Sequence, residues 1–381
     1  MTPPGARRPW QDVERIFLVM NYFGIGGSER RFANYFNYIG SRWDGRTACV
    51  LNRGVYAHCV GAGLLRPGPH LVPLGLRDRL PFAFGPGARA WSALERLAVR
   101  RGLLRLFSGA RDAAAYAIVG GVEFLPLLPC RRKVAAFVDP ECAALDTPAW
   151  RALPPGVTVA ASTERLAGVL RERARGRGWR ILADPCSFID YSRIAVRPKE
   201  PLAVFCARLS PEKQPGLFLD AAALVAARDA RARFLMLGRG PLEAGLRERV
   251  RALGLEGRVE IGFSQDPPAV LGRSAVYAAL QRTDNAHSQA LLEAMASENA
   301  VVATDVGQTR DYVDQSCGVL VPGEAPALAE ALGGLLADPQ RCGALGRAAR
   351  ARATERHTVE GFHRHMDFLM GPGGAARPPA P

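Results

Sequence analysis

The sequence predicts an α/β protein built from two doubly wound domains, each with a parallel sheet between layers of helices. The chain has 381 residues, which exceeds the size at which one hydrophobic core usually keeps growing. Short apolar segments alternate with segments of helical spacing, most regularly after Pro201, and this alternation is typical of a parallel sheet covered on both faces. Several apolar segments end in turns that contain glycine or cations, where such sheets bind ligands.

The second half of the chain has the most regular pattern. Segments expected to form strands begin near residues 202, 233, 258, 275, 300 and 318, and segments expected to form helices begin near residues 214, 241, 267, 288 and 325. Strands and helices therefore alternate, as crossovers between parallel strands require. Residues 339–370 have helical spacing and are expected to form terminal helices.

The first half shows the same alternation less regularly. Residues 16–20 are apolar and precede a glycine-rich turn and a helix from Glu29 to about Ile39, which Ser28 can cap. Further strands are expected at 46–52, 115–119, 133–138 and 157–160, with helices near 88–105 and 162–175. The segment 61–87 is rich in Gly and Pro and is expected to be a long loop that bears specificity.

These elements divide the chain into two domains and two terminal segments. We expect a first domain over 1–185 and a second over 186–356, joined between Asp184 and Lys199, with the active site in the cleft between them. Residues 357–370 are expected to form a helix that crosses back to the first domain. Residues 371–381 are rich in Gly and Pro and are expected to be disordered.

The composition is that of an ordinary globular protein in a reducing compartment. Apolar residues make up 48% and charged residues 23% of the chain. The eight cysteines include no C-x-x-C pair, so neither a disulfide framework nor a zinc site is expected. No apolar run has the length of a membrane span or of a signal-peptide core, and we expect a cytoplasmic protein.

Positive charge is concentrated in the first half of the chain. Residues 1–185 contain 27 Lys and Arg against 14 Asp and Glu, a net charge of +13, whereas residues 186–381 contain 23 against 22, a net charge of +1. The excess fits an anionic partner such as the inner face of a membrane or a lipid diphosphate, and plain solubility of an Arg-rich chain explains it equally well. Nucleic acid is not expected, because no reading motif accompanies the charge.

Two cations follow the strand that begins near residue 202. Arg208 and Lys213 are five residues apart in the turn between this strand and the next helix. Cations in such a turn can neutralise the charge that a departing diphosphate accumulates, and each interacts by about 4 kcal/mol with a phosphate oxygen 4 Å away at a surface-like dielectric. In isolation, two cations in an exposed turn can also be merely solvated.

A second motif lies at the start of the helix near Ser288. The free N–H groups of its first turn, over Ser288, Gln289, Ala290 and Leu291, can hold phosphate oxygens, and Ser288 and Gln289 add side-chain donors. Glu293 lies one turn inside and leans back toward the same end, where it can accept ribose hydroxyls. Asn285 precedes the helix and can bond to hexose hydroxyls. The alternative is that Glu293 is an ordinary polar residue beside a core stripe.

Several weaker candidates accompany these motifs. Gly238, Arg239 and Gly240 form a turn after a strand, and Glu260 and Ile261 lie in a strand that can present backbone groups to a nucleobase. Gly26 and Gly27 allow close approach to a phosphate or an acceptor, although a tight turn explains them as well. None of the six histidines has metal-ligand spacing, and no metal site is expected.

The motifs together resemble glycosyltransferase family 4, also called group 1 glycosyltransferases. The resemblance covers nearly all of the second half and, in the first half, mainly residues 15–39 and 157–193. Its motifs are Gly26-Gly27-Ser28-Glu29-Arg30, Ala207-Arg208-Leu209 through Lys213, Gly238-Arg239-Gly240-Pro241, Leu291 to Ala296, and Val301 to Gly307. The resemblance implies a GT-B fold, with two Rossmann-like domains facing across a cleft, and retaining transfer from a UDP- or GDP-sugar without a bound metal or other cofactor.

The resemblance also assigns roles to individual residues. Arg208 and Lys213 would bind the diphosphate, Glu293 the ribose, and Asn285 would stand in place of the first glutamate of the family's paired-glutamate motif. Many members have a histidine near the reacting carbon in the first domain, but the corresponding strand ends here contain none. Asp139 or Glu123 can substitute for it.

We therefore expect a hexosyltransferase of cell-surface glycan biosynthesis that acts on a lipid-linked or polysaccharide acceptor at the inner face of a membrane. The missing histidine leaves a second possibility, a catalytically degenerate subunit of a synthase that binds a nucleotide or glycan. A third is a nucleotide-sugar epimerase of the same fold, which would need carboxylates in the first domain, where only Asp139 and Glu123 stand out.

Overall fold

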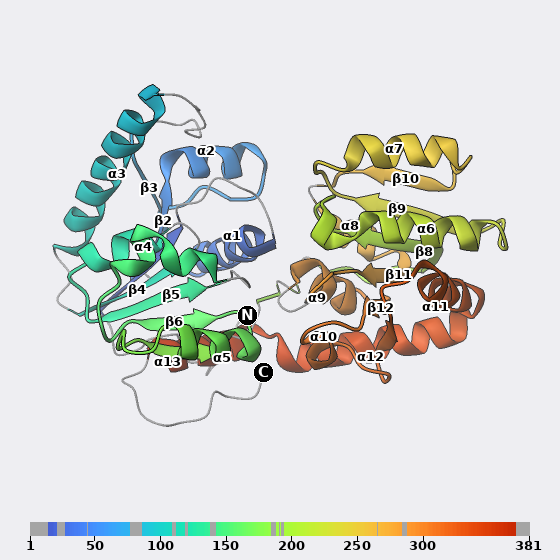
Figure 1. The fold of residues 1–381 in the computed structure, drawn as a ribbon. Coiled ribbons are helices and arrows are strands. Elements are labelled where there is room, and N and C mark those ends of the chain that lie inside the picture. Colours follow the sequence, from blue (N-terminus) through green and yellow to red (C-terminus); the bar gives the residue numbers. More distant parts are fainter. Residues whose placement is uncertain are drawn as a thin grey trace. The chain divides into compact units, whose positions relative to one another are not determined.

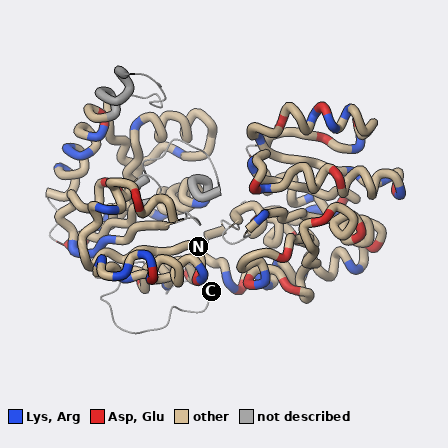
Figure 2. The backbone as a smooth tube through the Cα atoms, in the orientation of Figure 1, with Lys and Arg blue, Asp and Glu red and all other residues tan. Residues whose placement is uncertain are grey.

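The computed structural model describes residues 14–370 except 21–26, 44, 77–85, 109–111, 119–120, 138–141, 184–187, 190, 192–193, 265 and 284–287. The chain forms two compact units (Figure 1). Unit 1 comprises Met1–Phe188 and Val359–Pro381, and unit 2 comprises Ile189–Thr358. Each unit is an α/β domain with its own sheet and core. Acidic and basic residues intermingle along unit 2, whereas basic residues predominate on several helices of unit 1 (Figure 2).

Unit 2 contains a parallel sheet of six strands in the order β10-β9-β8-β11-β12-β13. The strands are β8 (Glu200–Cys206), β9 (Arg233–Leu237), β10 (Val259–Gly262), β11 (Ser274–Ala279), β12 (Ala300–Thr304) and β13 (Gly318–Val321). The strands predicted in this half are all confirmed, and each begins within two residues of the expected position.

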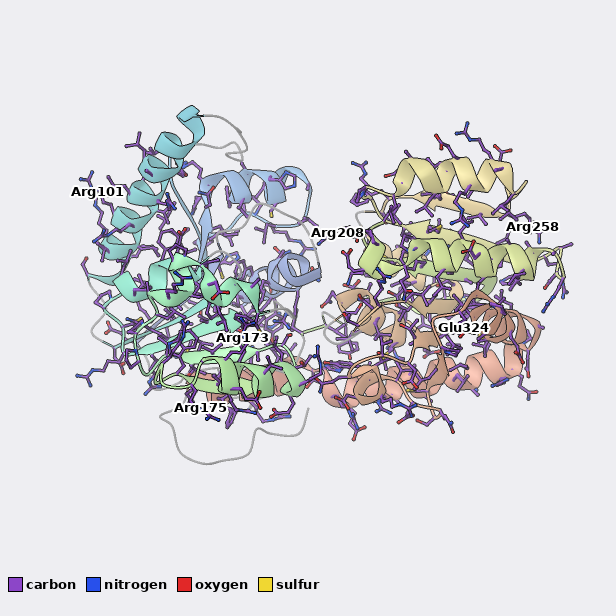
Figure 3. All side chains as sticks on the ribbon, viewed as in Figure 1. Arg101, Arg173, Arg175, Arg208, Arg258 and Glu324 are labelled. Atoms are coloured by element: carbon purple, nitrogen blue, oxygen red, sulfur yellow. The ribbon has the colours of Figure 1, made fainter. Side chains whose placement is uncertain are left out.

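Helices cover both faces of this sheet. They are α6 (Pro215–Ala226), α7 (Glu243–Ala252), α8 (Pro267–Leu271), α9 (Gln289–Ala296), α10 (Thr309–Tyr312), α11 (Ala325–Ala337) and α12 (Pro339–Arg356). Alternate residues of β8 serve the two layers, since Phe205 packs with α6, α7 and α11 while Val204 packs with α8, α9 and α12. Arg258, labelled in Figure 3, donates hydrogen bonds to carbonyls at the C-terminal end of α6, including that of Asp229.

Unit 1 contains a parallel sheet of seven strands in the order β3-β2-β1-β4-β5-β6-β7. The strands are β1 (Arg15–Met20), β2 (Thr47–Asn52), β3 (Leu71–Leu74), β4 (Ala113–Ile118), β5 (Arg132–Phe137), β6 (Thr158–Ala161) and β7 (Arg180–Ala183). Side chains of strand β1 alternate between the two faces of this sheet: Leu18 packs with one helical layer, and Phe17 packs with the other.

The helices of unit 1 form two layers around this sheet. One layer contains α1 (Gly27–Gly40), α2 (Arg53–Gly61) and α13 (Val359–Met370), and the other contains α3 (Pro86–Phe107), α4 (Pro148–Arg151), α5 (Glu164–Arg173) and the short 3₁₀ segment η1 (Val122–Leu127). Within the described part of the chain, no helix is both long enough and apolar enough to span a bilayer.

The C-terminal helix α13 packs into unit 1 although it follows unit 2 in the sequence. Phe362, Met366 and Leu369 are buried in the same core as the residues of α1, and burial of each such side chain typically contributes about 1.5–3 kcal/mol. The ring of Phe362 lies edge-on to that of Tyr35, with centroids 4.7 Å apart. Arg180 of β7 donates hydrogen bonds to the carbonyls of Phe368 and Leu369, which caps the end of the helix.

The expectation of a long loop over 61–87 is wrong for its described part. This segment contains strand β3, and helix α2 ends in it at Gly61. The strand escaped detection because Pro73 interrupts its apolar pattern, yet β3 is at the edge of the sheet, where a missing N–H is tolerated. Strand β7, at the other edge, was also not predicted, because only four residues pair with β6. The expected disordered tail at 371–381 lies outside the described residues.

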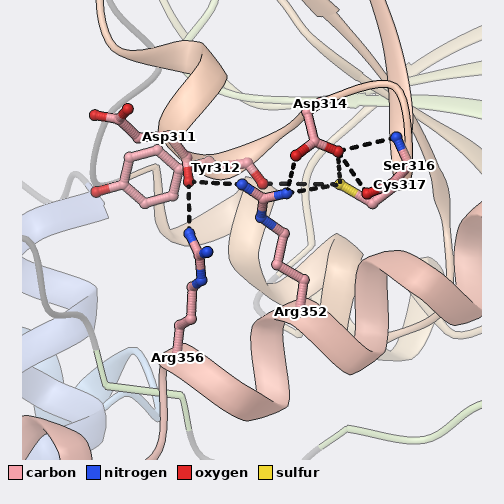
Figure 4. A network of polar contacts seen from close by, with 7 residues as sticks. All are labelled: Asp311, Tyr312, Asp314, Ser316, Cys317, Arg352 and Arg356. Atoms are coloured by element: carbon pink, nitrogen blue, oxygen red, sulfur yellow. Dashed lines mark hydrogen bonds and ion pairs between the residues drawn. The ribbon is translucent and has the colours of Figure 1, made fainter. Parts of the chain in front are cut away.

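Helix α12 is tied to the segment between α10 and β13 by two arginines (Figure 4). Arg352 donates hydrogen bonds to the carboxylate of Asp314 and to the carbonyl of Asp311, and Arg356 donates to the same carbonyl at 3.2 Å. Ser316 also donates to Asp314. These bonds lower the pKa of Asp314 to about 2 and fix α12 to the connection that leads into β13.

His357 is buried beside this network at the end of α12. Its ring stacks on that of Tyr312, with centroids 5.8 Å apart and planes inclined by 9°. Burial, reinforced by the neighbouring cations Arg356 and Arg352, lowers the pKa of His357 to about 4. The folded protein therefore keeps this imidazole neutral down to a more acidic pH than the unfolded chain does.

We expect His357 to make the free energy of unfolding depend on pH. An unfolded histidine takes up its proton near pH 6.5, so the stability that the neutral ring confers is lost as pH falls from about 6.5 to about 4, by on the order of 3 kcal/mol in total. Urea unfolding followed by circular dichroism should show a smaller loss in His357→Phe than in the wild type. The exposed-site control His58→Phe should keep the wild-type slope, and an unchanged slope in His357→Phe would contradict the assignment.

Candidate functional site

Strand order places the candidate site of unit 2 between β8 and β11. From β8, the chain proceeds to β9 and β10 on one side of the sheet and then returns to place β11 on the other. The loops that follow β8 and β11 therefore depart in opposite directions at the carboxyl ends of the strands, the place where doubly wound sheets bind ligands. Both principal motifs of the sequence are in these two loops.

Two hydrogen bonds join the loops. The side-chain amide of Gln214 donates to the carbonyl of Gln281 at 2.7 Å, and the backbone N–H of Arg282 donates to the carbonyl of Glu212 at 3.1 Å. Gln214 itself has a left-handed backbone (φ 52°), which ends the turn and starts α6. The predicted cations are thus held on a turn that is fixed to the loop after β11.

Arg208 is the more exposed of the two cations. Its side chain retains 61% of its accessible surface and lies 3.9 Å from the carboxylate of Glu212, at the edge of unit 2 (Figure 3). Ser210 donates a 2.6 Å hydrogen bond to that carboxylate, which lowers the pKa of Glu212. An exposed ion pair of this kind contributes at most about 1 kcal/mol, so Arg208 can exchange Glu212 for a more highly charged anion.

Lys213 lies in the short 3₁₀ segment Pro211–Lys213 and is half-buried. Burial lowers its pKa, an effect that Arg208 reinforces and Glu212 opposes. A half-buried ammonium group that lacks full solvation gains more from a bound anion than a solvated one does. Its environment therefore suits an anion-binding role.

Helix α9 presents the second motif. Ser288 caps it by accepting a hydrogen bond from the N–H of Leu291 at 3.3 Å, so that this N–H already has an acceptor. The N–H groups of Gln289 and Ala290 also lie in the first turn, where the helix provides no acceptor for them. They are the backbone donors that α9 offers to an anion. Leu291 is fully buried in the core, and its side chain has a structural role.

Glu293 is nearly buried, with 4% of its surface exposed. The side-chain amide of Gln289 donates to its carboxylate at 3.1 Å, and the Oε1 atom of Gln289 is itself buried without a hydrogen bond to any described residue. A carboxylate and an amide one turn apart at the start of a helix form a polar patch within an apolar core. The expected side-chain donor Gln289 is thus engaged with Glu293.

Tyr277 links the two halves of the site and was not predicted from the sequence. It lies in β11, is buried, and donates a hydrogen bond to the carbonyl of Cys206 at the end of β8 at 3.2 Å. Burial raises its pKa well above the usual value, the Glu293 carboxylate adds to the rise, and a hydrogen bond with Ser288 opposes it. The hydroxyl therefore lies among the end of β8, the cap of α9 and Glu293. A lone tyrosine in an otherwise small and aliphatic strand was the available signal.

Two glycines allow the turn after β9 to pack against the turn after β8. A Cβ atom on Gly238 would lie 1.9 Å from the carbonyl oxygen of Ala207, and one on Gly240 would lie 2.3 Å from that of Leu209. The backbone of Leu209 bonds to this second turn in both directions, donating to the carbonyl of Arg239 and accepting from the N–H of Leu242. The glycines therefore position the turn that carries Arg208, as close backbone approach requires.

Arg239 projects from this turn over an aromatic ring. Its guanidinium carbon is 4.7 Å from the centroid of Phe263, the first residue after β10, and 56% of the surface of Phe263 is exposed. A stacked cation and ring at the carboxyl ends of the strands form a flat surface that suits a planar heterocycle. The sequence analysis identified Arg239 but not its partner.

The two residues predicted in β10 are less well placed. The carbonyl of Ile261 accepts a hydrogen bond from Arg247 at 2.9 Å, which occupies the backbone group expected to meet a nucleobase. Glu260 lines a hollow of about 500 Å³ together with residues from the start of β8 and β9, such as Glu200 and Arg233. That hollow lies toward the amino ends of the strands, away from Arg208 and α9.

Some predicted residues lie outside the described part of the chain, namely Gly26, Asp139 and Asn285. Gly27 is the first residue of α1. Glu123 lies half-buried in η1, which follows β4 in unit 1. The structure thus joins the loop of Arg208 and Lys213 to the loop that leads into α9, places Glu260 away from them, and leaves the roles of all the candidates as predictions.

Comparison with known proteins agrees with the resemblance found in the motifs. Residues 200–338 match the family model described as glycosyl transferases group 1. Unit 2 resembles the group 1 glycosyltransferases. This match confirms the resemblance inferred from the sequence and covers the strands from β8 to β13 together with α6, α9 and α11.

Curated relatives match over a limited length. A D-inositol 3-phosphate glycosyltransferase of Nocardia farcinica is 33% identical over 185 residues, which cover 45% of this chain and 41% of the relative. A GDP-mannose-dependent alpha-(1-6)-phosphatidylinositol dimannoside mannosyltransferase of Mycobacterium tuberculosis is 29% identical over 158 residues, 41% of this chain and 40% of the relative. The chain thus spans about two fifths of the length of these relatives.

Solved structures match over nearly the whole chain at low sequence identity. TarM of Staphylococcus aureus has a TM-score of 0.72 at 12% identity and covers 94% of this chain and 100% of its own. HepE of Anabaena has a TM-score of 0.68 at 17% identity and covers 92% and 97%. The fold is therefore GT-B, with two Rossmann-like doubly wound domains, as the sequence predicts.

We expect Gly240→Ala and Gly238→Ala each to destabilise the protein by about 1–3 kcal/mol, because the added methyl group meets backbone atoms that cannot yield without displacing the turn after β8. Gly245→Ala is the matched control, since Gly245 lies in the first turn of α7 and a Cβ there meets no atom within 4 Å outside the helix's own backbone. This variant should be more stable by about 0.5–1 kcal/mol. Urea unfolding measures all three, and equal stability of Gly240→Ala and Gly245→Ala would refute the close approach.

Proposed function

We propose that the protein is a retaining glycosyltransferase that moves a hexose from a UDP- or GDP-sugar to a lipid-linked or polysaccharide acceptor. The observation that carries this proposal is the fixed pairing of two loops at the switch point of unit 2. One loop supplies Arg208 and Lys213, and the other leads into the start of α9, with Glu293 one turn inside. Cations opposite a helix N-terminus are suited to a diphosphate.

The charge of the site fits a leaving nucleoside diphosphate. Breaking the bond between sugar and diphosphate leaves negative charge on the phosphate oxygens, which Arg208, Lys213 and the first-turn N–H groups of α9 would stabilise. A cation 4 Å from such an oxygen contributes about 4 kcal/mol at a surface-like dielectric. These groups are fixed by the folded turns before the charge develops, and such preorganisation favours the transition state over the ground state.

The remaining groups of unit 2 suit the nucleoside. Glu293 is a buried carboxylate that accepts a hydrogen bond from the neutral amide of Gln289 and would accept hydrogen bonds from ribose hydroxyls. The surface formed by Arg239 and Phe263 would support the base. Asn285 would contact the hexose and Asp139 or Glu123 would assist in unit 1, as the resemblance to the family implies. No chemistry is assigned to a metal ion or another cofactor.

The comparisons support this donor class. HepE of Anabaena was solved with UDP-glucose, TarM was solved with UDP and alpha-GlcNAc-glycerol, and the mycobacterial relative is named for GDP-mannose. Two of the named relatives act on inositol-containing acceptors. A polar or lipid-linked polyhydroxyl acceptor at the inner face of a membrane is therefore the acceptor class that we propose.

The proposal predicts how single substitutions change catalysis. Arg208→Ala and Glu293→Gln should each lower the rate of sugar transfer or donor hydrolysis by about 100-fold or more, as removal of a preorganised group at a reacting centre does. The measurement is release of UDP or GDP from a panel of nucleotide sugars with and without acceptors. Calorimetric titration with UDP, GDP and ADP then identifies the base, with the tightest binding expected for UDP or GDP.

Arg231→Ala is the matched control, because Arg231 is a highly exposed arginine of the same unit beyond the end of α6. It should retain wild-type activity. Wild-type rates of sugar transfer in both Arg208→Ala and Glu293→Gln would contradict the proposed roles of these two residues in donor binding and catalysis. Nucleotide binding without product from any donor and acceptor would favour the degenerate binding subunit, and release of an altered sugar without acceptor would favour the epimerase.

A further inference from the structure

Helix α3 of unit 1 exposes a row of leucines on the side opposite the core. Val99, Leu103 and Phe107 are buried against the sheet. Leu94, Leu97 and Leu104 retain 51%, 43% and 39% of their surface, and their spacing of three and seven residues places them on one face of the helix. Helix α3 is therefore apolar on two sides, and the folded unit covers only one of them.

One further exposed leucine is fixed to the same helix. Leu76 is 56% exposed, and its backbone N–H donates to the carboxylate of Glu95 in α3 at 3.0 Å. The same carboxylate accepts a 3.0 Å hydrogen bond from Asn52. The three leucines on one face of α3 are each far more exposed than a core residue, which is unusual for a surface that contacts only water.

Cations surround these leucines. Arg100, Arg101 and Arg105 are exposed on α3, and none of them forms an ion pair with another described residue. Arg101 lies within the leucine row by spacing, and its side chain points outward from the unit (Figure 3). Glu95, the one acidic residue of α3, is turned to Asn52 and Leu76. Basic residues recur along the helix in Figure 2.

We propose that this leucine and arginine face of α3 docks on an anionic phospholipid surface. Charge decides the occupant: a second copy of the chain would bring three unpaired arginines against three others, whereas anionic head groups pair with them while the leucines enter the acyl boundary. Each arginine near such a surface contributes a favourable increment, and together they account for part of the net +13 of the first half.

Exposed leucines of unit 2 are isolated: among the described residues, Leu224 is the one exposed large hydrophobic residue of α6, and Leu253 is the one in the turn after α7. Helix α3 exposes three such leucines on one face. Docking through α3 involves no residue of the donor site. The vesicle-binding test therefore does not depend on whether the protein is a glycosyltransferase.

The test is sedimentation of the full-length chain, without nucleotide, with phosphatidylcholine vesicles and with vesicles of phosphatidylcholine and phosphatidylglycerol. The wild type should bind the anionic vesicles, bind the neutral vesicles at least tenfold more weakly, and lose affinity as salt is raised. Replacing Arg100, Arg101 and Arg105 by Gln should weaken binding to the anionic vesicles roughly 100-fold. Replacing Leu94, Leu97 and Leu104 by Gln should weaken binding to a similar extent.

Matched controls lie in unit 2. Replacing the exposed leucines Leu224 and Leu253 by Gln, or the exposed arginines Arg228, Arg251 and Arg347 by Gln, should leave vesicle binding unchanged. Circular dichroism of each variant verifies the fold, which substitutions at exposed positions should preserve. Equal binding by the α3 variants and the wild type would overturn the proposal. So would equal binding to neutral vesicles, or a wild type that ignores vesicles and forms a dimer that the α3 leucine variant does not form.

Discussion

The order of strands in unit 2 is the constraint on which the candidate site depends. Because β8 and β11 are neighbours while their following loops diverge, the strand order creates a switch point at the carboxyl ends of these two strands, where doubly wound sheets bind ligands. The hydrogen bonds from Gln214 to Gln281 and from Arg282 to Glu212 then fix the two loops to each other. The two principal motifs are positioned by this arrangement, since Arg208 and Lys213 belong to one loop and α9 continues from the other.

Neighbouring residues reinforce the arrangement from both sides. Gly238 and Gly240 allow the turn after β9 to contact the turn after β8. Tyr277 donates a hydrogen bond to the end of β8 and interacts with Ser288, the cap of α9. The C-terminal end of α9 is also held, since Lys199 donates a hydrogen bond to the carbonyl of Ser297 at 2.5 Å and Arg350 donates to that of Ala296. Cations at this end complement the helix dipole. Both ends of α9 are therefore held by hydrogen bonds to other described residues.

Local signals predicted the strands of unit 2, the turn with Arg208 and Lys213, and the helix with Glu293, because each depends on residues adjacent in the sequence. Tyr277, Phe263 and Gln281 were not predicted, since their roles arise from the order of strands, which brings together residues far apart along the chain. Strand β3 was missed because Pro73 reads as a breaker unless the strand is known to be at an edge. The stacking of Arg239 on Phe263 likewise requires the pairing of β9 with β10.

A crystal structure of the full-length chain with UDP or GDP tests the central claim most directly. The account predicts diphosphate oxygens within hydrogen-bond distance of the Arg208 and Lys213 side chains and of the N–H groups of Gln289 and Ala290, with the ribose against Glu293. A nucleotide bound elsewhere, with these groups facing solvent or one another, would contradict it.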